Sequence, residues 1–260
     1  MALSTPDLPL VPGREPRAGR EPRAGRVRGL GAIDESLASR VRPVSSSRDQ
    51  LLPLLEALVP LLPGGGLQRG MVIGVGGSES GPGPAVPDTT RSGTAGGGVG
   101  TLAFALLAAA STAGSWCAAV GTADPGILAI AELGVDLDRL ALVPWPGTAW
   151  PEVTAVLLDD MDVVLVRPPG RVGTGVARRL IARARQRRAV LVVQSGPGVW
   201  PEGPDIRLAV AEGAWGGVDR GHGHLRGRRV EVVTSGRRSA TRAVRTGLWL
   251  PAASGAVAAR

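Results

Sequence analysis

The chain has 260 residues and a formal net charge of +8, and all 30 of its basic residues are arginine. Its length suits one domain of about 200 residues with tails, or two small domains. Cys117 is the single cysteine, which excludes an internal disulfide framework and a cysteine-based zinc site. The charge favours polyanions or acidic partners without choosing among them. Because no basic-then-apolar leader pattern is present, we expect a cytoplasmic protein.

The first part of the chain shows one compositionally biased tail and two short apolar segments. Residues 1–47 are rich in Arg, Pro, Gly and Ser and contain a duplicated GREPRA, so we predict a disordered basic tail. Leucines at helical spacing over 51–58 predict a helix that Pro60 stops. The apolar run 71–77 is typical of a buried strand, and 78–98 is typical of a low-complexity loop.

From there to residue 193, helical and strand patterns alternate, which predicts βαβ units and a mostly parallel sheet. The predicted strands are 116–121, 139–144, 162–169 and 189–196, and the predicted helices are 99–112, 125–134, 150–161 and 173–188. Segments 205–215 and 226–236 alternate like antiparallel strands and finish one edge. The uncharged stretch 100–121 is long enough to span a membrane, but its polar centre predicts a helix, a turn and a strand instead.

Several of these segments resemble the core domain of the RecA recombinase superfamily. They are GGGLQRG before the first strand, ADPGILAIAELGVDLDRLALVPWP at 123–146, and the late strands DIRLAVAEG and LRGRRVEVV. The resemblance implies an α/β, RecA-like three-layer core with a mostly parallel sheet and antiparallel edge strands. We place this domain at 48–235 and expect 236–260 to be a disordered basic tail.

Within that superfamily, the chain is similar to the ImuA-type accessory proteins, including the actinobacterial ImuA-prime form, through its length, its basic tail and GLWLP at 247–251. This resemblance implies a role in damage-induced, error-prone translesion DNA synthesis. The implied partners are ImuB, an inactive Y-family polymerase relative, and an error-prone replicative-type polymerase, with single-stranded DNA nearby. Two alternatives stay open: a RecA-like DNA-dependent ATPase or nucleotide-gated DNA-binding protein, and a basic DNA-binding module without the mutagenesis role.

The stretch GGGVGTLAFALL at 96–107 has the outline of a phosphate-binding loop that runs into a helix. A working loop reads G-x-x-x-x-G-K-[ST], in which the lysine reaches the phosphates and the hydroxyl binds Mg²⁺. Aligned on the superfamily, Gly98 is the last loop glycine, Val99 takes the lysine position and Gly100 the hydroxyl position, with Thr101 next. The chain contains no lysine that could substitute.

Two further elements of phosphoryl transfer are also missing by this alignment. The predicted strand 162–169 places Arg167 where a metal-binding carboxylate belongs, and Thr122 and Ala123 stand where the superfamily has a catalytic glutamate. Because phosphoryl transfer depends on positioned charge, we predict no ATPase activity, no cofactor and no metal. Weak nucleotide binding through the backbone N–H groups at 98–101 stays an alternative. His222 and His224 lack a third metal ligand in sequence reach.

Two arginine clusters and one apolar triplet are candidate contacts for DNA or for a partner. The candidate residues are Arg178, Arg179, Arg183, Arg187, Arg237, Arg238, Trp249 and Leu250. The arginines form either a solvated face or a surface for phosphate or for an acidic peptide. The triplet around Trp249 either docks a partner or packs back on the domain.

Overall fold

The computed structural model of the chain describes residues 50–77, 98–219, 222–236 and 243–260. All of them belong to one compact unit that spans Ser45–Arg260. The predicted tail 1–47 and nearly all of the predicted loop 78–98 lie outside the described residues, as do Arg237 and Arg238.

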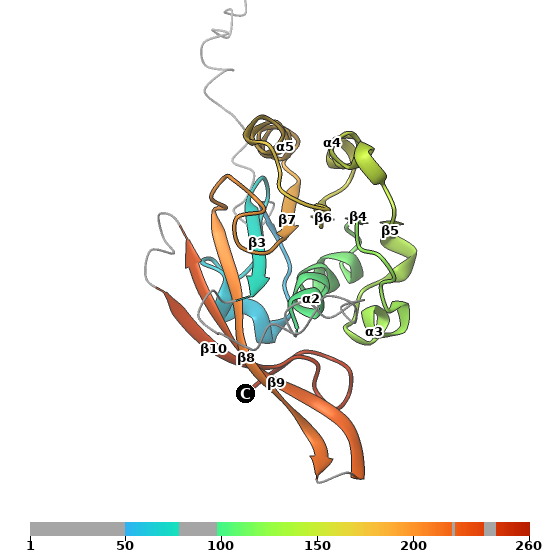
Figure 1. Cartoon of the computed structure of the whole chain (residues 1–260), viewed down its shortest axis with the longest axis vertical. Helices are drawn as coiled ribbons and strands as arrows, with labels where there is room; N and C mark the ends of the chain where they lie inside the picture. Colours follow the sequence, from blue (N-terminus) through green and yellow to red (C-terminus); the bar gives the residue numbers. More distant parts are fainter. Residues whose placement is uncertain (1–49, 78–97, 220–221, 237–242) are drawn as a thin grey trace, which may run out of the picture. The chain divides into compact units, whose positions relative to one another are not determined.

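A nine-stranded sheet forms the centre of this unit (Figure 1). Its strand order is β11-β10-β9-β8-β3-β7-β6-β4-β5. The parallel strands are β3 (Val72–Gly77), β4 (Cys117–Val120), β5 (Leu140–Val143), β6 (Val163–Val166), β7 (Val190–Gln194) and β8 (Ile206–Asp219). The antiparallel edge consists of β9 (His222–Gly236), β10 (Val244–Trp249) and β11 (Ala258–Ala259). The predicted mostly parallel sheet with antiparallel edge strands is confirmed.

Helices cover both faces of the sheet and complete three layers (Figure 1). The helices are α2 (Val99–Thr112), α3 (Ile127–Glu132), α4 (Trp150–Asp160) and α5 (Thr174–Arg187). α2 and α3 contribute to one hydrophobic core, and α4 and α5 contribute to the other. In β6, Val163 belongs to the first core and Val164 to the second, because successive side chains of a strand point to opposite faces. Burial on both faces explains why the parallel strands are continuous apolar runs.

The uncharged stretch 100–121 forms most of α2, a turn and β4, as predicted. α2 ends at Thr112, and Gly114 follows with a positive φ of 98°. Among the helices that the structure describes, none is long and apolar enough to cross a membrane.

The helix predicted from the leucines of 51–58 is wrong. The structure has a two-residue strand, β1 (Leu51–Leu52), paired with β2 (Leu67–Gln68), and then a 3₁₀ helix, η2 (Glu56–Leu61). Proline disfavours helical backbone at the residue before it, so Pro53 keeps Leu52 extended and in the ladder. The leucine spacing reflects burial instead, because Leu58 is fully buried in the core that contains α2.

The predicted disordered C-terminal tail also needs correction where the structure describes it, over 243–260. β10 pairs with β9 and β11 pairs with β10, which extends the sheet beyond the expected boundary at residue 235. Leu248 and Leu250 are fully buried and belong to the same core as α2. The burial of these two leucines is the physical reason that the segment packs as part of the domain, which is the second of the two alternatives left open for it.

Candidate functional site

The candidate site lies where β3, β4, β6 and β7 end, at the carboxyl edge of the parallel sheet. The helix that follows β3 covers one face and the helix that follows β6 covers the other, so this edge contains a topological switch point, where α/β proteins bind ligands. Two cavities of about 250 Å³ and about 180 Å³ open there. Arg167 and Gln194 line both of them.

Three of the four residues predicted for the degenerate phosphate loop line these cavities, and the fourth, Gly98, directly precedes them. Gly98 precedes α2 with a φ of 105°, and no side chain caps the helix. Val99 lines the larger cavity but is only 4% exposed, and it packs into the core. Gly100 and Thr101 line the smaller cavity. The position aligned with the missing lysine is therefore an apolar, buried wall.

Arg167 follows β6 directly, as predicted, and its backbone N–H donates a hydrogen bond to the Val120 carbonyl at the end of β4 (2.9 Å). Asp124 is the one carboxylate that the structure describes in the walls of these cavities. Thr122 is 6% exposed, and its Oγ1 has no hydrogen-bond partner among the described residues. Mg²⁺ prefers several oxygen ligands in a compact octahedral set. Among the described residues of these walls, the charged side chains are one guanidinium and one carboxylate.

Sequence reasoning missed Arg228, which β9 brings to the start of α2. Its Nη1 lies 3.6 Å from the position that a β carbon on Gly98 would occupy. Its Nε is buried without a described hydrogen-bond partner, and burial lowers the pKa of this guanidinium. A signal was available: in the alternating segment 226–236, Arg228 shares a face with Val230 and Val232, which are both buried.

The arginines predicted on α5 are all present on its surface, but each one is paired with a carboxylate. Arg178 pairs with Glu202 (2.7 Å), and Arg179 pairs with Glu152 (3.6 Å). Asp159 pairs with both Arg183 and Arg187, the latter at 3.0 Å. Arg185 on the same helix pairs with Asp205 at 3.2 Å. The partners come from α4 and from the segment between β7 and β8. A phosphate group would therefore share each of these arginines with a carboxylate that already offsets its charge.

Asp159 is the centre of that arrangement. It accepts hydrogen bonds from the Nε atoms of Arg183 (2.7 Å) and Arg187 (3.0 Å). The hydrogen bond from Arg183, helped by the charges of both arginines, lowers the pKa of Asp159 below its ordinary value of 3.8. The same bond raises the pKa of Arg183.

We expect Asp159→Asn to lower the urea midpoint of unfolding at neutral pH, because the ion pairs that join α4 to α5 are lost. A carboxylate whose pKa is lower in the folded state than in the unfolded state stabilises the fold at pH values above its unfolded pKa. This stabilisation is lost as the pH falls through the folded-state pKa. The difference between Asp159→Asn and the wild type should therefore shrink below about pH 3.8. Asp160→Asn, which removes a neighbouring carboxylate with no described ion pair, is the control. An equal effect of both substitutions at every pH would contradict the assignment.

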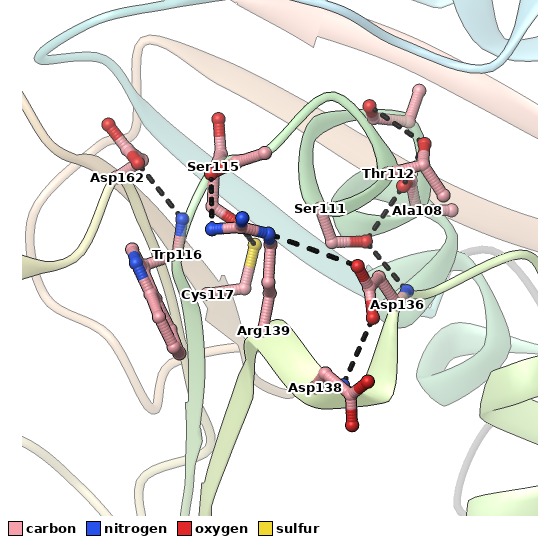
Figure 2. A network of polar contacts seen from close by, with 12 residues as sticks. Ala108, Ser111, Thr112, Ser115, Trp116, Cys117, Asp136, Asp138, Arg139 and Asp162 are labelled. Carbon is pink, nitrogen blue, oxygen red and sulfur yellow. Dashed lines mark hydrogen bonds and ion pairs between the residues drawn. The ribbon is translucent and has the colours of Figure 1, made fainter.

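The LGVDLDRL motif, which carries much of the resemblance, forms a structural network at the opposite edge of the sheet (Figure 2). Asp136 caps a short 3₁₀ turn by accepting from the Asp138 N–H (3.0 Å), and its own N–H donates to Ser111 Oγ of α2 (2.9 Å). Arg139 lies over the Trp116 ring at 5.4 Å and donates to a backbone carbonyl of the turn after α2. These contacts fix α2 against the starts of β4 and β5.

Leu250 and Trp249 are the other predicted contact residues that the structure describes. Leu250 is buried, and its Cδ2 lies 3.7 Å from where a β carbon on Gly98 would be, so two predicted sites meet. Trp249 is half-buried in β10. Among the described residues, no group of three or more His, Cys, Asp or Glu side chains is arranged to hold a metal ion.

Comparison with known proteins assigns the family. The family model of the MT3502 N-terminal domain matches residues 82–202. The chain is also 37% identical, over 181 residues, to the uncharacterized protein Rv3395c of Mycobacterium tuberculosis (strain ATCC 25618 / H37Rv), with 68% of this chain and 80% of that protein covered. The chain belongs to the MT3502 family. The residues that match the family model include α2, Arg167, which lines both cavities, and the paired arginines of α5.

A solved structure identifies the fold of this MT3502-family chain. The crystal structure of the RadB recombinase is similar with a TM-score of 0.52 and 16% sequence identity, covering 78% of this chain and 96% of that one. At this identity the likeness concerns the fold alone. The predicted RecA-like core is confirmed.

Proposed function

We propose that this protein is a non-catalytic, RecA-like accessory factor of damage-induced, error-prone translesion DNA synthesis. It acts by binding an inactive Y-family polymerase relative of the ImuB type together with an error-prone replicative-type polymerase. The RecA-like fold and the membership of the MT3502 family support the coarse part of this proposal. The resemblance to ImuA-type proteins supports the role and the partners.

The observation that carries the non-catalytic part is the wall of the two cavities. Phosphoryl transfer requires cations on the phosphates and carboxylates that hold Mg²⁺. Here Val99 is an apolar wall, and Arg167 takes the position expected for the metal ligand. A cation at that position repels Mg²⁺. The scaffold is therefore retained without the charges that the reaction needs, which suits a protein that works by docking.

We expect the purified full chain to retain an ImuB-type protein in a pull-down, and to retain no catalytically active Y-family polymerase, which is the matched control. Complex formation should persist without nucleotide, because the cavity does not fit Mg²⁺-ATP. Retention of neither protein, together with tight DNA binding at physiological salt, would contradict the proposal and favour a basic DNA-binding module.

A second candidate is a nucleotide-gated DNA-binding protein that binds a phosphate group without hydrolysing it. The observation that favours it is Arg228, whose guanidinium supplies a cation beside the first turn of α2. Helix N-termini attract anions, and an arginine there adds to the attraction. Calorimetric titration with ATP, with and without Mg²⁺, separates the two candidates: micromolar affinity without turnover supports the second.

A further inference from the structure

The β8–β9 hairpin extends beyond the sheet that anchors it. β8 pairs with β3 only as far as Val210, opposite Gly77, whereas the β8–β9 ladder continues to Asp219 opposite His222. Figure 1 shows this hairpin extending away from the parallel strands and their helices. Apolar burial does not explain the extension, because residues 213–215 and 223–226 are exposed.

An aromatic side chain lies on this extension. Trp215 is 46% exposed. It stands opposite Arg228, whose guanidinium carbon lies 5.7 Å from the ring centroid. The guanidinium covers part of the indole, and the exposed remainder is available to a planar ligand.

The arginines of the hairpin differ from those of α5 in their surroundings. Arg226 and Arg229 are exposed, and neither makes an ion pair with any described carboxylate. Glu231, the nearby acid with a described side chain, is already paired with Arg245 at 2.6 Å. On α5, by contrast, every arginine discussed above has a carboxylate partner. The hairpin therefore presents positive charge that the described part of the fold does not neutralise.

A bulge shapes the ribbon around these side chains. The ladder shifts register between Gly216 and Val218, and Gly217 lies between them with a φ of 97°. A β carbon at Gly217 would lie 2.8 Å from Arg226 Cγ, so the backbone packs closely under this arginine. Bulges increase the local twist of a hairpin.

We propose that the extended part of this hairpin, residues 211–219 and 222–228, binds single-stranded nucleic acid. Trp215 stacks on an unpaired base, and Arg226 contacts the backbone phosphates. Exposed aromatic rings interleaved with arginines are the means by which proteins bind single strands without reading sequence. The proposal rests on the hairpin alone and holds whether or not a polymerase partner binds.

The test uses the full chain and a fluorescently labelled oligothymidylate of about 20 nucleotides, with binding followed by anisotropy at several salt concentrations. We expect Trp215→Ala to weaken binding about tenfold, because stacking on each base makes a large contribution. Trp215→Phe, which keeps an aromatic face, should recover most of the affinity. Arg226→Ala should reduce the slope of log K against log salt concentration by about 0.7.

Two matched controls separate this surface from general effects of charge and exposure. Trp145→Ala removes an indole that is 71% exposed, and Arg185→Ala removes an ion-paired arginine of α5; both should bind like the wild type. Urea unfolding of each variant establishes that the fold is kept. The proposal is overturned if the wild type does not bind at low salt, or if Trp215→Ala binds like the wild type in a folded state. It is also overturned if polyglutamate competes as well as oligothymidylate does, since that result identifies a surface for acidic polypeptides.

Discussion

Replacing Gly121 with alanine is expected to lower the free energy of unfolding by about 2–5 kcal/mol, the sum of a backbone and a packing cost. Gly121 directly follows β4 and has a φ of 75°, a conformation that alanine adopts only with strain. A β carbon there would also clash with the backbone carbonyl oxygen of Arg167. That carbonyl cannot withdraw easily, because the Arg167 N–H is hydrogen-bonded to Val120 (2.9 Å) and the Gly121 N–H to Val143 (2.9 Å).

Gly114→Ala separates these two costs. Gly114 also has a positive φ, 98°, but a β carbon there meets no atom within 4 Å. Gly114→Ala should therefore lower the free energy of unfolding only by the backbone strain, about 1–2 kcal/mol. Equilibrium urea unfolding of the two variants measures both. If Gly121→Ala were no worse than Gly114→Ala, β4 and β6 would not meet closely at the candidate site, and the arrangement of Arg167 would be wrong.

Leu250→Ala is expected to cost about 2–5 kcal/mol, the usual range for a leucine removed from a packed core. Leu250 is fully buried in the core that contains α2, and it lies beside Gly98 at the start of that helix. Its loss therefore leaves a cavity between the last strands and α2. The neighbouring Trp249→Ala should cost less, because Trp249 is only half-buried.

This pair of variants distinguishes packing from docking in the WLP segment. Thermal or urea unfolding gives the stability, and retention of the ImuB-type protein gives the docking. If both variants were as stable as the wild type and both lost the partner, the segment would be a docking peptide and its packing against the core would be contradicted.

The arrangement of the parallel core could be predicted from the sequence because local patterns determine it. Continuous apolar runs gave β4, β6 and β7, and helical periodicity with end signals such as Pro151 gave α4 and α5. The absence of lysine could be read directly from the composition. The position of Arg167 could be predicted because this residue directly follows a strand.

What the sequence could not reveal are contacts between segments far apart in the chain. The arginines of α5 stand without nearby acids in the sequence, and only the packing of α4 brings Asp159 to Arg183. Arg228 reaches Gly98 only because β9, β8 and β3 are neighbours in the sheet. Leucine spacing likewise indicated burial over 51–58 but not the backbone that achieves it.

The central claim, that the RecA-like scaffold has lost phosphoryl transfer, is tested most directly by phosphate release from ATP. The purified full chain is assayed with Mg²⁺, with and without single-stranded DNA. We expect no release above the blank, because the alignment on the RecA superfamily puts Val99 and Arg167 at the positions of the lysine and the metal ligand. Release that requires Mg²⁺, increases with single-stranded DNA and disappears in Thr101→Ala would contradict it.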